Sequence, residues 1–186
     1  MTDLIHQSAK IFHKYGCLLL VRAPMLKVIS SIFAGLILLM STSTEAQNQF
    51  DASPKLGDLI FLALDHGVDS IRQGGPLVPF IMTDTDGKRS FNRFVAEPYE
   101  KAVAEAKAAA TKLPPQSHLY ALAYDGFITV GGKKYDAIIV HGAERGQGNA
   151  YLLAQRYVPA SNGKPLESIG NPAFIGRENA LFQNPP

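Results

Sequence analysis

The chain has 186 residues, of which 46% are hydrophobic, and this length fits one small domain. Its formal net charge of +2 comes from residues 1–46, which hold four basic and two acidic side chains, whereas residues 47–186 hold 14 of each. A neutral domain lacks the positive surface on which nucleic-acid binding depends, so we expect no nucleic-acid partner.

Residues 1–46 have the features of a leader with a secretory signal peptide. The segment from Met25 combines an early lysine, an apolar run over 28–40 and a small polar stretch that ends at Ala46, where a peptidase would cut. This run is shorter than the roughly 20 residues of a membrane-spanning helix. We therefore expect translation from Met25 and export to the periplasm or the medium. The alternative is an uncleaved leader that anchors the chain, and it would be the only contact with a membrane.

A helix and a hairpin open residues 47–159, which we predict to form one α+β domain. Ser53-Pro54 provides an N-cap hydroxyl and a first-turn proline, and apolar residues then recur at helical spacing as far as Ile71. Strands over 77–83 and 88–95 follow, joined by an acidic turn that we expect to be bulged. The exposed side of the helix carries Asp65, His66, Asp69 and Arg72, which we interpret as a solvated face and not as a metal site.

A second helix, over 99–112, and three strands complete the predicted domain. Gly131-Gly132 lies between two runs rich in β-branched and aromatic residues. Two glycines favour a two-residue hairpin turn because they tolerate positive φ. The third strand covers 150–158 and ends at Pro159.

The glycine turn sets the register of the hairpin and thereby selects the candidate site. Because side chains alternate between the faces of a strand, Asp125 and Asp136 become diagonal neighbours on one face. Two close carboxylates need a cation, a shared proton or an arginine, and Arg156 on the third strand could supply the arginine. Two further residues are candidates for catalysis, Glu144 and His141, of which His141 lies on the opposite face. Arg145 and Arg156 are the candidates for binding.

Residues 160–186 are rich in Gly, Pro, Asn and Ser, so we expect an irregular C-terminal wrap that ends in a frayed tail. The element order α-β-β-α-β-β-β predicts an α+β fold with a single antiparallel sheet of about five strands and two helices. This order is similar to the profilin-like and roadblock-type arrangement.

Four stretches of the chain carry a resemblance to known proteins, namely Ser70–Phe80 (SIRQGGPLVPF), Arg93-Phe94, Tyr120–Gly126 (YALAYDG) and Ala154–Tyr157 (AQRY). Together they resemble a family of small bacterial proteins that has no established activity. The resemblance would cover roughly residues 56–158 and implies no catalytic residues. The leader departs from the pattern of that family.

The sequence contains no catalytic or cofactor motif with specificity, and we predict no metal and no cofactor. Gly146 and Gly148 join two strands and do not open a helix, as a dinucleotide-binding loop would. We therefore expect an exported, non-enzymatic module that binds a protein or a small ligand, with a homodimer through a sheet edge or helix as one arrangement. The alternative is a metal-dependent or acid–base hydrolase that uses Asp125 and Asp136.

Overall fold

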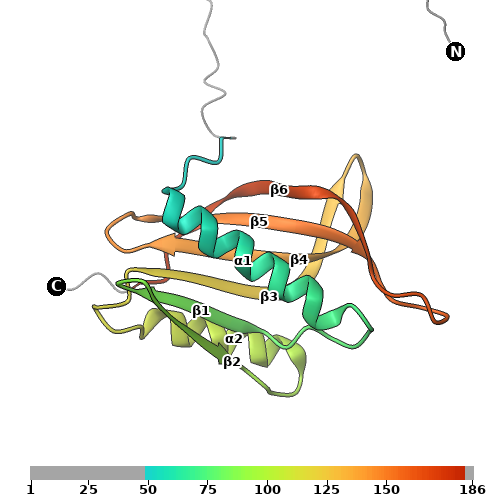
Figure 1. The fold of residues 1–186 in the computed structure, drawn as a ribbon, viewed down its shortest axis with the longest axis horizontal. Coiled ribbons are helices and arrows are strands. Elements are labelled where there is room, and N and C mark those ends of the chain that lie inside the picture. Colours follow the sequence, from blue (N-terminus) through green and yellow to red (C-terminus); the bar gives the residue numbers. More distant parts are fainter. Residues whose placement is uncertain (1–48, 183–186) are drawn as a thin grey trace, which may run out of the picture. The chain divides into compact units, whose positions relative to one another are not determined.

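The computed structural model describes residues 49–182 and has the expected α+β fold (Figure 1). Its strands form a single antiparallel sheet of six strands, one more than expected, in the order β2-β1-β3-β4-β5-β6. The elements are α1 (Pro54–Ile71), β1 (Phe80–Thr85), β2 (Lys88–Arg93), α2 (Tyr99–Thr111), β3 (Leu119–Val130), β4 (Lys133–Glu144), β5 (Asn149–Val158) and β6 (Glu167–Asn179).

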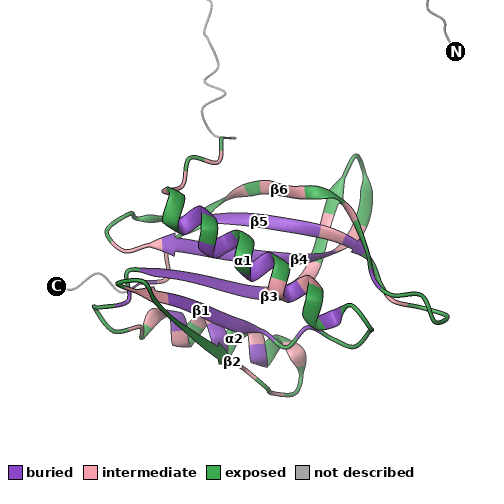
Figure 2. Cartoon of the chain, viewed as in Figure 1, coloured by how far each residue is buried: buried purple, intermediate pink, exposed green. Residues whose placement is uncertain are grey.

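The two helices cover opposite faces of the sheet, with α1 in front of it and α2 behind it in Figure 1. The larger core lies between α1 and the sheet. In the smaller core, Ala106 and Ala110 bring α2 close to Tyr120 and Leu122 of β3. Strands β3 to β5 are buried where the helices cover them (Figure 2), so this part of the central hairpin is enclosed from both sides.

The register predicted for the β3–β4 hairpin is confirmed. Val130 pairs with Lys133, and the two glycines between them have positive φ, 58° for Gly131 and 79° for Gly132. A two-residue turn of this kind matches the twist of the strands that it joins. The turn therefore determines which residue of β4 pairs with each residue of β3.

The turn of the first hairpin is not bulged, contrary to the prediction. Thr85 pairs directly with Lys88, and the residues between them, Asp86 and Gly87, have positive φ of 52° and 82°. The backbone N–H of Gly87 donates a hydrogen bond to Asp84 Oδ1 at 2.8 Å. The acidic side chain thus closes the turn.

The prediction of an irregular C-terminal wrap is wrong, because residues 167–179 form β6 beside β5. Gly170, Pro172 and Gly176 hid this strand by interrupting the alternation that marks a strand in a sequence. The structure accommodates them with two register shifts, and an edge strand tolerates proline because its outer N–H needs no partner. The domain therefore continues beyond residue 159 as far as Phe182, which packs in the core under α2.

The predicted leader, with its start at Met25 and its cleavage after Ala46, lies outside the described residues. In the part of the chain from residue 49 to 182, neither helix has the length and apolar character that crossing a membrane requires.

Candidate functional site

Two tyrosines from different elements hold Asp125. Its Oδ1 accepts a hydrogen bond from the Tyr157 hydroxyl on β5 at 2.7 Å, and its backbone N–H donates to the Tyr99 hydroxyl at the start of α2 at 2.6 Å. The pairing of β1 with β3 stops at Ala123. Tyr99 therefore satisfies a backbone donor that no neighbouring strand reaches.

The register brings Asp136 next to Asp125, as the sequence predicted. Asp136 pairs with Phe127, two residues along β3, and with Tyr157 on β5. Burial raises the pKa of Asp125; the hydrogen bond from Tyr157 opposes this rise and the nearby charge of Asp136 adds to it. Burial also raises the pKa of Tyr99 to about 12 and raises the pKa of Tyr157. Both hydroxyls are therefore protonated at neutral pH.

The suggestion that Arg156 pairs with the two acids is wrong. Arg156 pairs with Ala137 in the β4–β5 register and so lies on the opposite face, with its guanidinium 5.2 Å from the centroid of the Tyr135 ring. Tyr157, the next residue, faces Asp125 instead. The carboxylate is thus held by a neutral hydroxyl and not by a cation.

His141, a further candidate, lies on the α2 face and belongs to a buried hydrogen-bonded group. The Tyr120 hydroxyl lies 3.0 Å from His141 Nδ1, and a Glu178 carboxylate oxygen lies 3.7 Å from Nε2. Because the Tyr120 oxygen accepts from the N–H of Leu181, its own proton is available to Nδ1. Burial lowers the pKa of His141, which favours the neutral ring. These contacts tie β6 and the residues after it to the central hairpin.

Glu144 and Arg145 make their contacts away from Asp125, Glu144 within the loop between β4 and β5 and Arg145 with the segment between α2 and β3. Glu144 accepts a hydrogen bond from the Gln147 side chain at 3.1 Å. Arg145 lies with its guanidinium 4.1 Å from the centroid of the Phe182 ring and donates to the carbonyl oxygens of Leu113, Pro114 and Ser117. Within residues 49–182, no three His, Cys, Asp or Glu side chains are grouped so that they could hold a metal ion.

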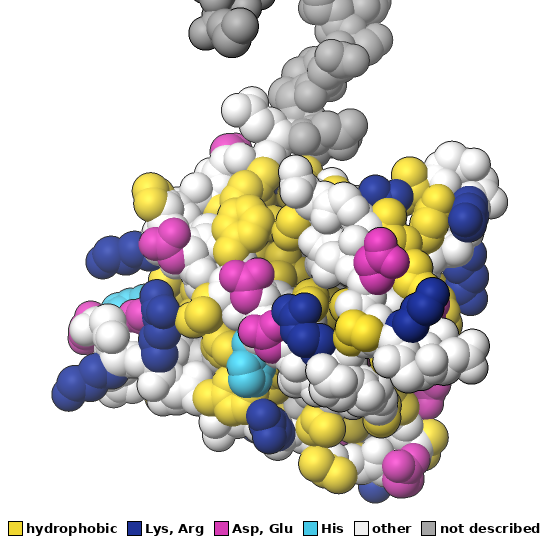
Figure 3. All heavy atoms as spheres, turned by 45° about the vertical axis from the view of Figure 1, so that its right-hand side comes forward, with side chains coloured by type: hydrophobic (Ala, Val, Ile, Leu, Met, Phe, Trp, Pro, Cys, Tyr) yellow, Lys and Arg dark blue, Asp and Glu magenta, His cyan; other side chains and the backbone are white. Residues whose placement is uncertain are grey.

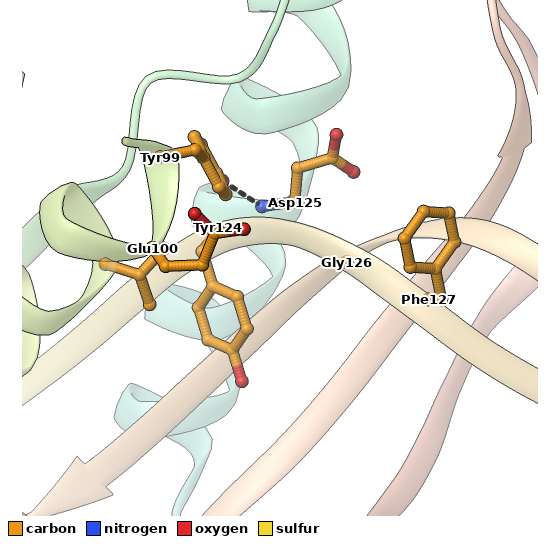
Figure 4. Close-up of a pocket in the computed structure, with 7 residues that line it drawn as sticks. Tyr99, Glu100, Tyr124, Asp125, Gly126 and Phe127 are labelled. Atoms are coloured by element: carbon orange, nitrogen blue, oxygen red, sulfur yellow. Dashed lines mark hydrogen bonds between the residues drawn. The ribbon is translucent and has the colours of Figure 1, made fainter. Parts of the chain in front are cut away.

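A cavity of about 390 Å³ opens beside Asp125 (Figure 4), and we call it the aromatic cavity. In Figure 4 the Asp125 carboxylate points away from Tyr124, so this residue borders the cavity chiefly with its backbone. Sequence reasoning missed the cavity because its only signal is a tyrosine at the start of a helix. The side chains around it are Tyr99, Glu100 and Val103 from α2 and Tyr124 and Phe127 from β3.

The aromatic cavity lies against a length of β3 that has no neighbouring strand on one side. β1 pairs only with residues 119–123, and none of the described strands pairs with residues 125–130 on that side. We call residues 125–130 the open edge. The N–H of Asp125 points to this side, and backbone groups two residues apart share a side in a strand. Phe127 and Thr129 therefore direct their N–H and C=O groups to the open edge.

The outer edges of the sheet are protected against pairing, whereas the open edge is not. β2 carries Lys88, Arg89 and Arg93, and charged side chains on an edge strand oppose association. β6 contains a proline and two register shifts that disrupt its ladder. Residues 126–130 contain neither a charge nor a proline, and the Phe127 side chain is 59% exposed. The open edge is therefore the part of the sheet best suited to accept another strand.

The face of the molecule drawn in Figure 3 carries acidic, basic and hydrophobic side chains interspersed, without a continuous patch of one charge. No family model, curated protein or solved structure matches this chain. The resemblance to a bacterial family and the likeness to the profilin-like and roadblock-type arrangement remain predictions. The function is therefore inferred from the geometry of the open edge and the aromatic cavity.

Proposed function

We propose that the protein is an exported, non-enzymatic module that binds an extended peptide segment of a partner protein along the open edge. The peptide adds a strand beside β3 and places one apolar or aromatic side chain in the aromatic cavity. The observation that carries this proposal is the run of backbone groups without a strand partner in residues 125–130, next to a cavity with aromatic walls.

The backbone groups and the cavity are complementary to two parts of such a peptide. Phe127 and Thr129 each offer one donor and one acceptor, which supply affinity for any extended main chain. Tyr99 already occupies the N–H of Asp125, so pairing begins at Phe127. Tyr99, Tyr124 and Phe127 then provide a pocket for a side chain, which supplies selectivity.

The test starts from a phage-displayed library of random short peptides, selected on the full-length chain. We expect the selected sequences to share one apolar or aromatic residue within a β-favouring stretch, and to bind as synthetic peptides with a Kd on the order of micromolar. Thr129→Pro should abolish this binding, because proline has no N–H. The fold should persist, since the Thr129 N–H faces the open edge and not β4.

Thr129→Val is the matched control, because it changes the side chain and keeps the N–H. It should bind the selected peptides as the wild type does. Peptides that bind equally well to the Thr129→Pro variant would overturn the proposal. A stable dimer that Thr129→Pro dissociates would also overturn it, because a second copy of this chain would then occupy the open edge.

One observation favours the hydrolase alternative, namely the raised pKa of Asp125 beside Asp136, since carboxyl groups that act as general acids share this property. Against it, the Asp125 carboxylate is occupied by Tyr157 and points away from Tyr124 in the aromatic cavity. The two functions separate in a screen of chromogenic ester, phosphate and glycoside substrates. Turnover that is lost in both Asp125→Asn and Asp136→Asn but kept in Thr129→Pro would establish the hydrolase.

A further inference from the structure

A second cavity, of about 480 Å³, lies between the C-terminal half of α1 and the first half of β6. The register of β5 with β6 shifts here, so that residues 170–172 lie opposite Gln155 alone, and we call the space the bulge cavity. Bulges of this kind redirect side chains and recur beside functional sites. The N–H of Leu166 donates to the carbonyl oxygen of Arg72 at 2.9 Å and so ties the start of β6 to the end of α1.

Gln155 brings to this cavity a hydrogen-bond acceptor whose direction is fixed. The residue is only 5% exposed, and its Nε2 donates to the carbonyl oxygens of Arg156 at 2.8 Å, Gly170 at 3.2 Å and Ile169 at 3.4 Å. Because carbonyl oxygens surround this end of the planar amide, the nitrogen must lie there and Oε1 at the other end. Oε1 accepts no hydrogen bond from residues 49–182, and it is open to the cavity that Gln155 lines. A buried side chain with one free acceptor at a cavity points to a ligand that donates.

Asp65 of α1 brings a negative charge that no described cation neutralises. Its carboxylate forms no ion pair and no hydrogen bond with any residue of 49–182. Asp69, one turn further along α1, differs because the Arg72 guanidinium lies 2.6 Å from its Oδ1. The charged side chains that line the cavity are these three, so its net charge is negative. Asp65 and the Oε1 of Gln155 both accept hydrogen bonds, and a ligand that binds them together must be a donor with a positive charge.

We propose that the bulge cavity binds a small organic ammonium ion, the protonated form of a primary amine on a short hydrocarbon chain. One N–H of the ammonium group donates to the Oε1 of Gln155 and another to the Asp65 carboxylate, whose charge complements the cation. The hydrocarbon chain lies against Leu64, Val68 and Pro172, the apolar side chains that line the cavity. A metal ion fits less well, because residues 49–182 contain no group of three acidic, histidine or cysteine side chains that could hold one.

The side-chain amide of Gln155 in the full-length, ¹⁵N-labelled chain reports on this binding directly. In titrations at pH 7 and constant ionic strength, we expect butylammonium to shift its signals saturably, with a Kd on the order of millimolar because the ligand has few atoms. Butanol lacks the charge and butyltrimethylammonium lacks the N–H donors, so each should bind about tenfold more weakly or less. Ser168 and Asn171 also line the cavity and can donate or accept, so glycerol is the probe for a polyol site.

Asp65→Asn should weaken butylammonium binding by about tenfold, because it removes the charge and keeps the size of the side chain. Asp58→Asn is the matched control, since Asp58 is exposed on the same helix but does not line the cavity, and it should leave the affinity unchanged. Unchanged backbone amide signals of β3 and β4 show that each variant is folded. Equal binding of butyltrimethylammonium, an equal loss in both aspartate variants, tighter binding of glycerol or Ca²⁺ than of butylammonium, or no saturable shift of the Gln155 signals would each overturn the proposal.

Discussion

The hydrogen bond from Tyr157 to Asp125 can be removed without disturbing the surrounding core, which makes Tyr157→Phe the sharpest test of the candidate site. The substitution keeps the ring that packs under α1 and removes only the donor to Asp125 Oδ1. A hydrogen bond to a charged group stabilises a fold by about 1.5–3 kcal/mol. Asp125 is only half-buried, so water replaces part of this contact. We expect a loss of about 1–2 kcal/mol in the free energy of unfolding at pH 7.

The size of this loss should depend on pH. Because the folded state raises the pKa of Asp125, the free energy of unfolding falls as the pH rises from the ordinary pKa to the raised one. Without the Tyr157 hydroxyl the pKa of Asp125 should rise further, so the fall becomes larger. Below about pH 3 the carboxyl is mostly protonated in both folded and unfolded chains. The difference between variant and wild type should therefore be largest at neutral pH and smallest in acid.

Urea denaturation followed by circular dichroism measures both effects. With an m value of about 1–3 kcal/mol per M, the expected loss lowers the midpoint by roughly 0.3–2 M at pH 7. Tyr135→Phe is the control, because the Tyr135 hydroxyl has no hydrogen bond with any residue of 49–182. Equal losses in the two variants, or a loss for Tyr157→Phe that stays constant into acid, would refute the assigned contact.

Three further predictions concern packing, alkaline pH and export. Gly142→Ala should lower the free energy of unfolding by about 1–3 kcal/mol in a urea titration, because the new Cβ would clash with Ile60 of α1. Gly148→Ala is the control, because a Cβ at that position meets open space. Equal stabilities of the two variants would contradict the contact of α1 with β4. The fold raises the pKa of five of the seven tyrosines, that of Tyr99 to about 12, so stability should fall above pH 10. The share of the tyrosinate absorbance that belongs to these five side chains should appear only together with unfolding, and an absorbance that reaches its full value before the fold is lost would contradict their burial. Mass spectrometry of the exported protein should find a new N-terminus immediately after Ala46, and full-length chain confined to the cytoplasm would contradict export.

The central hairpin could be predicted residue by residue because one turn determines its register. Gly131 and Gly132 permit a two-residue turn, and all the pairs between β3 and β4 follow from it. The closeness of Asp125 and Asp136 was therefore predictable. The sequence did not predict which side chains of β5 lie on which face of the sheet, because a loop without a fixed turn geometry precedes that strand. This is why Arg156 was assigned to the acids and Tyr157 was overlooked.

The remaining features of the site depend on contacts between residues far apart in the chain. The connection from β2 brings Tyr99, the first residue of α2, next to the place where the pairing of β1 with β3 ends, and there Tyr99 contacts Asp125. No local sequence pattern predicts this contact. β6 was hidden for a related reason, since bulges opposite β5 absorb its proline and glycines. Periodicity describes a strand by its own residues, whereas these features are properties of neighbouring strands.

The difference in length between two neighbouring strands explains why a site forms at this place. β3 has 12 residues and β1 has 6, so half of β3 extends beyond its neighbour. Selection for stability alone would cover such an edge or place charges along it, because an apolar edge promotes aggregation. Here Tyr99 caps one donor and leaves the apolar stretch beyond it uncovered by any described strand. On β4, Lys134 lies beside the edge with its Nζ 3.7 Å from the centroid of the Phe127 ring. This lysine is on the neighbouring strand and leaves the backbone groups of residues 126–130 accessible, as the proposed binding of a peptide strand requires.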